Sequence, residues 1–341
     1  MKKVFYLTSL SVLWLFSCSL EDTTVKITFG SCGSHKDPLP MLDIASGLDP
    51  DVFIFLGDNV YGDTRDMNIL REKYDSLGSR PEFQRLWSST EVLATWDDHD
   101  YGENDAGRHY PNKEESKAIF LEFWKVPENS ERRNHPGIYG AEYLVKDGLI
   151  VQFILLDTRT FRDNLQRVQA SDSLIYKNDY KPNLSPDSTF LGEDQWKWLE
   201  NELERPADIR IIASSNQFSH EYNGWESWTN VPHEQRRMIN LINKTKASGV
   251  IFISGDVHWG EISKLENSDG YPIYDVTSSG IVQTWHHIEP NSNRLGSAVP
   301  QNNIGLITIN KTTEIEIQME IIDSTGLPVV SEKINIDSIS F

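Results

Sequence analysis

The sequence predicts an α/β fold of two mixed sheets flanked by helices, formed by a single domain. Two observations support this prediction. Residues 52–56 and 249–253 are continuous apolar runs, which are typical of buried parallel strands joined by helices. From residue 262 onward the pattern changes to short alternating strands, with hairpin signals at 269–270 and 324–326 that indicate antiparallel pairing. Because no linker separates the two parts, we expect the antiparallel region to form a second sheet of the same domain.

The first half of the chain is expected to alternate strands with helices. Strands are indicated by unbroken or alternating apolar residues, and helices by apolar residues three and four positions apart. A strand, a helix and a second strand in succession form the unit of a parallel pair. The predicted elements are a strand at 25–29, a helix at 38–48, a strand at 52–56, helices at 67–77 and from Pro81, a strand at 92–96, a helix at 113–125 and a hairpin of strands at 138–145 and 149–156.

The second half begins with residues 162–191, a polar stretch rich in Ser, Asp, Asn and Pro. Connections of this length are uncommon in compact domains unless they have a function. We expect the stretch to lie over the functional site. His109 and His220 belong to no motif and are expected to be surface or packing residues, but among such histidines they are the best candidates for the rim of the site. The predicted elements that follow are a helix from Glu193, a strand at 209–213, a helix through Met238 and Leu241 and a strand at 249–253.

The composition is strongly acidic. The chain carries 32 Lys and Arg against 51 Asp and Glu, a net charge of -19. Such a charge repels polyanions, which argues against a nucleic-acid-binding protein. The excess of carboxylates can also supply sites for hard cations, although most of these side chains are expected to be solvated. We expect the protein to be a monomer.

Residues 1–17 have the order of an export signal, because two lysines precede an apolar run that is too short to span a bilayer. The segment that ends at Cys18 resembles a bacterial lipoprotein processing box, in which the cysteine becomes the lipidated first residue. A plain signal peptide cut nearby is the alternative. On the first interpretation, residues 18–25 are a tether and residues 26–341 are the folded domain. The protein is then an exported lipoprotein of the periplasm or cell surface, attached to the membrane by its lipid anchor only.

Five predicted strands end in residues of the kinds that bind metals. Single residues of these types after a strand are more often turn or cap residues. In a parallel sheet, however, the carboxyl ends of the strands lie along one edge, so these residues can converge there. They are Cys32, Asp58, Tyr61, Asp98, His99, Asn216, Asp256 and His258. Once Cys18 is processed, Cys32 has no disulfide partner, so it is either a buried thiol or a metal ligand.

The ligand types fall into two sets. A thiolate, a phenolate and an imidazole suit a transition metal, and the first two together favour ferric iron over zinc. Carboxylates and an amide oxygen suit calcium, magnesium or manganese. Asp58 is a candidate bridge between the two ions. Paired cations would allow so acidic a protein to accept an anionic substrate, because they invert the local field.

Five segments resemble, in their order and spacing, the alkaline phosphatase D (PhoD-like) family of calcineurin-like metallophosphoesterases. The segments are 30–32, 57–61, 96–100, 157–159 and 255–258, and the resemblance runs from about residue 27 to residue 285. It implies a metallophosphoesterase-type βαβ sandwich and a phosphoric ester hydrolase. The implied cofactors are Fe³⁺ with one or two Ca²⁺, or another divalent metal at the second site. Long members of the family carry an extra amino-terminal β domain, where this chain has the predicted tether.

The same resemblance implies a role for each candidate residue. The metal ligands are Cys32, the bridging Asp58, Tyr61, Asp98, Asn216, Asp256 and His258. Cys32 occupies the position where most metallophosphoesterases carry an Asp and His pair, and Tyr61 replaces the more usual aspartate as an iron ligand. Asn216 stands near the place of a metal-binding histidine.

These assignments predict that a metal-bound hydroxide attacks a phosphate ester in line, with His99 as the general acid for the leaving alkoxide. Arg159 is expected to bind the substrate phosphate, and an ion pair with Asp157 or another carboxylate is the alternative. Two other functions stay open. A phosphodiesterase or phospholipase D-like hydrolase would use the same site, so the substrate is a phosphate mono- or diester. A non-catalytic surface lipoprotein that binds calcium or glycan would hold no iron.

Overall fold

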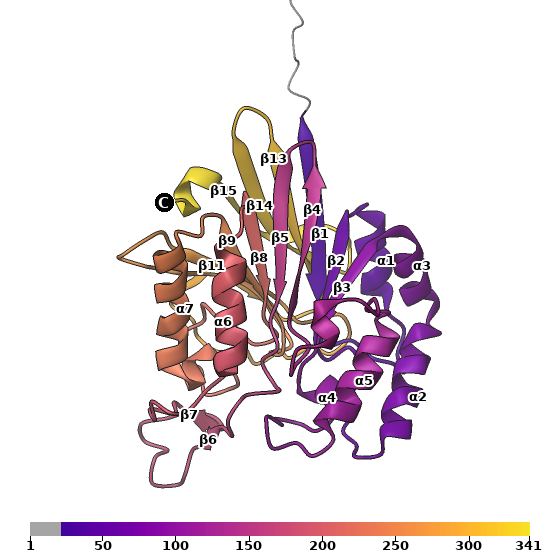
Figure 1. Cartoon of the computed structure of the whole chain (residues 1–341), viewed down its shortest axis with the longest axis vertical. Helices are drawn as coiled ribbons and strands as arrows, with labels where there is room; N and C mark the ends of the chain where they lie inside the picture. Colours follow the sequence, from indigo (N-terminus) through magenta and orange to yellow (C-terminus); the bar gives the residue numbers. More distant parts are fainter. Residues whose placement is uncertain (1–21) are drawn as a thin grey trace, which may run out of the picture.

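The structure is a computed structural model that describes residues 22–341, so the predicted signal segment and Cys18 lie outside the described residues. The helices are α1 (Pro40–Gly47), α2 (Met67–Gly78), α3 (Pro81–Ser89), α4 (Asp98–Tyr101), α5 (Lys113–Phe123), α6 (Gly192–Leu203) and α7 (Pro232–Thr245). Figure 1 shows α1, α2, α3 and α5 on one side of a central pair of sheets, and α6 and α7 on the other side. This arrangement confirms the predicted α/β fold of two mixed sheets flanked by helices.

The first sheet has six strands. Their order is β15 (Pro328–Asn335), β14 (Ile315–Asp323), β13 (Asn303–Lys311), β1 (Thr23–Gly30), β2 (Val52–Leu56) and β3 (Glu91–Thr95). Strands β1, β2 and β3 run parallel, whereas β13, β14 and β15 form an antiparallel meander that joins the sheet at β1. Strand β1 begins at Thr23, two residues earlier than the alternation of apolar residues predicts.

The second sheet has seven strands. Their order is β12 (Arg294–Val299), β10 (Gly260–Leu265), β11 (Ile273–Ser278), β9 (Val250–Ser254), β8 (Ile209–Ala213), β5 (Leu149–Leu155) and β4 (Gly140–Lys146). The prediction that the antiparallel region forms the second sheet is wrong, because β13, β14 and β15 join the first sheet and β10, β11 and β12 join the second. The predicted antiparallel pairing also fails at one place, since β11 pairs parallel with β9. Strand β10 pairs antiparallel with β11 on the side of β11 that faces away from β9. The chain therefore reverses between β10 and β11, and β11 runs in the same direction as β9. A two-stranded ribbon of β6 (Gln166–Arg167) and β7 (Tyr180–Lys181) lies within the long polar stretch.

The main core lies between the two sheets. Every residue of β2, β8 and β9 is buried, as the continuous apolar runs predict for β2 and β9. Apolar side chains of both sheets share one cluster, for example Ile27 of β1 and Val151 of β5, and a second cluster fills the space under α1 to α5. Within residues 22–341, no helix has the length and apolar character needed to cross a membrane. The packing therefore brings the ends of β1, β2 and β3 of the first sheet beside the ends of β8 and β9 of the second. The predicted ligand residues thus come from two sheets and not from the edge of one.

Candidate active site

Four of the predicted ligands leave their strands through left-handed backbone conformations. Cys32 has a φ of 56°, Asp58 of 50°, Asp256 of 72° and His258 of 64°. This region is unfavourable by roughly 1–2 kcal/mol for a residue that carries a Cβ. Such residues persist where the surrounding structure holds them, and they cluster at functional sites. The sharp turns that they form direct the side chains toward one another at the sheet edge.

Gly57 allows the loops after three strands to approach one another. Its φ is 102°, and a Cβ at this position would lie 2.5 Å from the Cβ of Asp97. The carbonyl oxygen of Gly57 accepts a hydrogen bond from the backbone N–H of Cys32 over 3.3 Å. Any larger residue would therefore separate the loop after β2 from the loop after β3.

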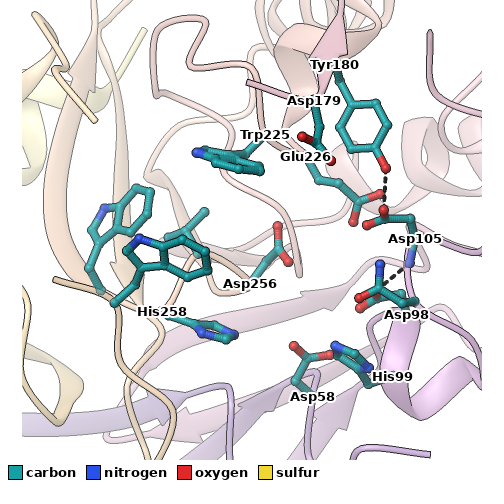
Figure 2. Close-up of a pocket in the computed structure, with 14 residues that line it drawn as sticks. Asp58, Asp98, His99, Asp105, Asp179, Tyr180, Trp225, Glu226, Asp256 and His258 are labelled. Carbon is teal, nitrogen blue, oxygen red and sulfur yellow. Dashed lines mark hydrogen bonds between the residues drawn. The ribbon is translucent and has the colours of Figure 1, made fainter. Parts of the chain in front are cut away.

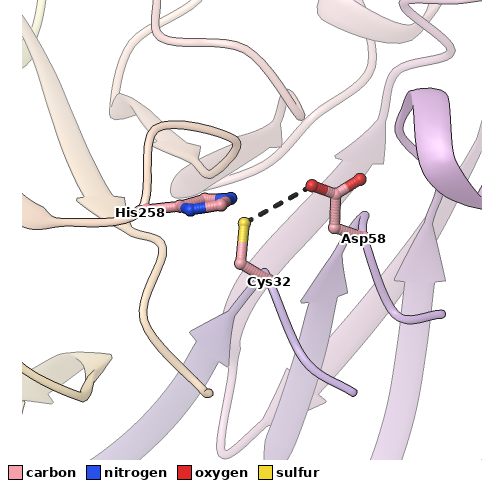
Figure 3. Close-up of side chains that lie close together, drawn as sticks. All are labelled: Cys32, Asp58 and His258. Atoms are coloured by element: carbon pink, nitrogen blue, oxygen red, sulfur yellow. Dashed lines mark hydrogen bonds between the residues drawn. The ribbon is translucent and has the colours of Figure 1, made fainter. Parts of the chain in front are cut away.

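Cys32, Asp58 and His258 form the first group of ligand atoms, which all lie within 4.8 Å of one another (Figure 3). The Sγ of Cys32 lies 3.5 Å from Oδ2 of Asp58 and 3.1 Å from Oγ of Ser279. Tyr61 joins this group, because its Oη lies 3.3 Å from Nε2 of His258. The structure thus brings together a thiol, a phenol, an imidazole and a carboxylate, which is the set expected for a transition metal.

Asp58 also belongs to an oxygen-rich group with Asp97, Asp98 and Asp256, whose carboxylate oxygens lie within 4.8 Å of one another. Asn216 adds an amide to this group, since its Nδ2 donates a hydrogen bond to Oδ2 of Asp256 over 3.2 Å. The membership of Asp58 in both groups fits the bridging position predicted for it. Oxygen ligands of this kind suit hard cations.

Several oxygens of this site are buried without a hydrogen-bond partner. They are Oδ1 of Asp58, Oδ2 of Asp97, Oδ1 of Asp98 and Oδ1 of Asn216. A buried polar atom left unpaired costs about 1–3 kcal/mol, and more when it is charged. Bound cations would satisfy these atoms, so the residues present fit the metal centre that the sequence predicts.

The pKa values lead to the same conclusion. Burial raises the pKa of Asp58 well above its ordinary value, and the charges of Cys32 and Asp98 raise it further. Burial also raises the pKa of Asp256, with Asp97 as the next cause, and burial raises the pKa of the Cys32 thiol. A site that holds several acidic groups so close together favours their neutral forms unless a cation compensates.

His99 is held by Asp63, a residue that the sequence analysis did not select. Nδ1 of His99 lies 2.7 Å from Oδ1 of Asp63, and the carbonyl of His99 accepts a hydrogen bond from the N–H of Gly62 over 3.0 Å. Burial lowers the pKa of His99, but the bond to Asp63 and the charge of Asp98 outweigh it and raise the pKa to about 9. A protonated imidazole that lines the cavity is suited to donate a proton.

Arg159 is fully buried, with 0% of its side chain exposed. Its guanidinium forms an ion pair with Asp97 and donates hydrogen bonds of 3.0 and 2.6 Å to the two carboxylate oxygens of Glu226. The structure therefore favours the ion-pair alternative over contact with a substrate phosphate, with Asp97 and Glu226 as the partners in place of Asp157. A buried guanidinium requires such partners to offset its desolvation. Burial alone raises the pKa of Asp98, but the charge of Arg159 helps to bring it down to about 2.

A cavity of about 230 Å³ opens over these groups. Figure 2 shows Asp58 on one side of the cavity and Trp225 on the other. Asp179 and Tyr180 also line it, which confirms that the polar stretch 162–191 contributes to the rim of the site.

The sequence analysis missed several residues of the site. They are Asp63, Asp97, Glu226, Trp225 and Trp285. Asp63 and Asp97 stand next to the predicted motifs, and this position is the signal that could have selected them. His220 is not at the rim but is a packing residue, because its side chain is buried with Nε2 3.4 Å from Oε1 of Glu261. His109 is exposed and is not one of the residues that line the cavity.

Comparisons with known proteins agree with this geometry. The family model described as PhoD-like phosphatase matches residues 31–303. Alkaline phosphatase D of Bacillus subtilis (strain 168) is 27% identical over 192 residues, which are 51% of this chain and 32% of that protein. The match thus spans about a third of the length of that curated relative.

Two solved structures share the fold. The structure of PhoD superimposes with a TM-score of 0.67 at 16% identity, over 92% of this chain and 68% of that chain. Purple acid phosphatase PPD1 from yellow lupin (Lupinus luteus) seeds gives a TM-score of 0.59 at 13% identity, over 93% of this chain and 54% of that chain. The fold of this chain is therefore that of the metallophosphoesterase structures.

Proposed function

Since this chain belongs to the PhoD-like phosphatase family, we propose that it hydrolyses phosphate esters in a metal-dependent reaction. One observation carries the proposal. The loops after the parallel strands bring two groups of ligand atoms together, and Asp58 belongs to both of them. The buried oxygens without hydrogen-bond partners lie in the same place.

The proposal assigns iron to the ligand set of Cys32, Tyr61, His258 and Asp58, and calcium to the oxygen-rich set. The sulfur and phenol ligands support the first assignment. His258 supports it as well, because burial and then the charge of His99 lower its pKa to about 4, so that its imidazole is neutral and able to bind a metal. The second set consists of Asp58, Asp98, Asn216 and Asp256.

When bound, the cations would supply a deprotonated water as the nucleophile and positive charge for the phosphoryl oxygens. His99 is the general acid in this proposal. Asp63 holds Nδ1 of His99, so the proton that reaches the leaving alkoxide comes from Nε2. The cavity walls orient the ester over these groups.

The experiment combines elemental analysis with activity on a nitrophenyl monoester and a bis-nitrophenyl diester. Protein prepared with both metals freely supplied is expected to contain iron and calcium and to hydrolyse at least one ester, and the ratio of the two rates then assigns the monoesterase or diesterase class. A preparation that contains calcium but no transition metal, and that hydrolyses neither ester, would instead support the non-catalytic lipoprotein.

The proposed location rests on the sequence alone. Export followed by lipidation of Cys18 predicts that the protein partitions into the membrane fraction, and that Cys18→Ala releases it into the soluble exported fraction. Mass spectrometry of the amino-terminal peptide tests the modification directly.

A further inference from the structure

Two indole side chains form one wall of the cavity above the predicted metal ligands. The rings of Trp225 and Trp285 have centroids 6.0 Å apart and planes inclined at 52°. Trp285 is tied to the metal-binding loop, because its backbone N–H donates to the carbonyl of His258 over 2.8 Å and its ring centroid lies 6.3 Å from that of the imidazole. The two indoles thus make a corner directly beside the proposed centre.

The side chain of Trp285 is more exposed to solvent than is usual for a tryptophan. It is 48% exposed, and it is the one exposed tryptophan among residues 22–341. Tryptophan is highly buried on average, and leaving an indole in water forgoes the free energy of its burial. A flat group that enters the cavity and stacks on the corner would recover that free energy.

Apart from the imidazole of His99, which lies among the proposed metal ligands, the cavity offers no cation to a second anionic group. None of the described residues that line it is Lys or Arg. The nearby guanidinium of Arg159 is buried and paired with Glu226. Arg167 pairs with Asp179 and stacks over the ring of Tyr180, with 5.1 Å between the guanidinium and the ring centroid.

The cavity also carries carboxylates that belong to neither proposed set of metal ligands. Asp105, Asp179 and Glu226 line it together with the indoles. The field there is neutral to negative once their ion pairs are formed, so a second phosphate on the substrate would meet repulsion. The cavity is therefore expected to bind a phosphate group at the proposed metal ligands and nowhere else.

We propose that the Trp225 and Trp285 corner is the subsite for the leaving group, and that it selects esters of a single phosphate whose alcohol carries an uncharged aromatic ring. This inference rests on the proposed phosphate ester hydrolysis at the same site. The reacting phosphate lies over Asp58, the ring stacks on the indoles, and a second phosphate group on the same molecule is excluded.

The test compares three ligands that share one 5′-phosphorylated ribose. These are adenosine 5′-monophosphate, ribose 5-phosphate, which lacks the base, and adenosine 3′,5′-bisphosphate, which adds a second phosphate. Each is measured as a competitive inhibitor of nitrophenyl ester hydrolysis by the metal-loaded protein. Stacking of one base on an aromatic side chain corresponds to roughly a tenfold to hundredfold effect. We therefore expect the monophosphate to bind at least tenfold more tightly than either of the other two.

Variants separate stacking from general damage to the site. Trp285→Ala should weaken the monophosphate about tenfold and leave ribose 5-phosphate unchanged, whereas Trp285→Phe should retain most of the preference. Trp87→Ala is the matched control, since Trp87 is a half-buried tryptophan of α3 that packs against Phe83 with centroids 5.6 Å apart. Trp87→Ala should not change the ratio of the inhibition constants.

Two outcomes would overturn the inference while the proposed function stands. One is an active protein that binds the monophosphate and ribose 5-phosphate equally, and the other is an active protein that binds the bisphosphate most tightly. If the metal-loaded protein hydrolyses no ester, the proposed function fails. Calorimetric titration with the same three ligands then decides between a stacking subsite and none.

Discussion

Oδ1 of Asp63 lies 2.7 Å from Nδ1 of His99, so Nε2 is the nitrogen of that imidazole that remains available to the cavity. Asp63 follows β2, whereas His99 follows β3, and the two loops are held together by the bond between the N–H of Gly62 and the carbonyl of His99. The pair therefore sets the orientation of the proposed acid before any substrate arrives.

Replacing His99 is expected to affect esters according to their leaving groups. Alkoxides need a proton as the bond to phosphorus breaks, and general acid catalysis contributes on the order of 10²–10⁴ in rate. His99→Ala should lower kcat by about that factor on an alkyl phosphate and by less than about tenfold on a nitrophenyl ester. Equal losses on both substrates, measured with the metal content held constant, would remove His99 from the role of acid.

Removing the charge of Asp63 should give a milder form of the same defect. Asp63→Asn is expected to lower kcat on the alkyl ester by roughly tenfold, with little change in KM or in metal content, because the imidazole loses its orienting carboxylate. Asp75→Asn, an exposed aspartate of α2, is the matched control and should behave as the unchanged protein. A loss of metal in Asp63→Asn would indicate that Asp63 supports the metal centre instead.

Tyr61 should give the iron form of the protein a visible colour. A phenolate bound to ferric iron absorbs visible light by charge transfer, and Oη of Tyr61 lies 3.3 Å from the metal-binding nitrogen proposed for His258. We expect Tyr61→Phe to abolish the visible band while iron remains measurable by elemental analysis. If the band persists in Tyr61→Phe, the phenolate of Tyr61 is not its source.

Chelation is expected to destabilise the protein, and to do so more at higher pH. The pKa values of Asp58 and Asp256 are raised in the folded, metal-free protein. Protonation of these two carboxyl groups therefore stabilises the chelated protein fully below the ordinary carboxyl pKa, near 4. This stabilisation is lost as the pH rises through the raised pKa values. The Tm of the chelated protein should therefore fall as the pH is raised above about 4, and restored metal should raise Tm most at the highest pH tested.

A variant tests the electrostatic origin of that effect. Asp58→Asn removes one of the crowded charges, so it should raise the Tm of the chelated protein at pH 8. It should also abolish the gain in Tm on addition of metal, because the proposed bridge is lost. An unchanged response to metal in this variant would contradict the bridging role.

The buried ion pairs of Arg159 should be essential for folding stability. Arg159→Met leaves Asp97 and Glu226 without their shared partner, and breaking a buried pair in this way costs about 3–5 kcal/mol. The exposed pair of Arg65 and Glu103 is the control, and Arg65→Met should change the free energy of unfolding by less than about 1 kcal/mol. Urea denaturation of both variants measures the difference.

The sequence was sufficient for the α/β fold class and for the convergence of strand ends within each sheet, because both follow from local patterns. It did not indicate that the ends of strands from two sheets meet at the site. Buried parallel strands appear as unbroken apolar runs, and their carboxyl ends meet at one edge. The roles of Asp97 and Arg159 could not be predicted in the same way. Both depend on Glu226, which is distant in sequence and belongs to an irregular segment without periodicity.

The indole corner was missed for a related reason. Trp225 and Trp285 come from two irregular segments that approach each other only in the folded protein. The helix α4 was missed because four residues are too few to show a helical period. The left-handed conformation of Cys32 likewise leaves no sequence signal, since glycine, asparagine and aspartate are the residues that adopt it more readily.

Strand β1 connects the end of the molecule near the proposed lipid anchor to the end that carries the cavity. The strand begins at the top of Figure 1 and runs from Thr23 to Gly30, beside the loop that carries Cys32, which at about 3.3 Å per step is a distance of roughly 23 Å. We propose that attachment through the lipid at Cys18 would place the cavity at the end of β1 that is distant from the anchor, which would favour dissolved esters over the phospholipids of the same membrane as substrates.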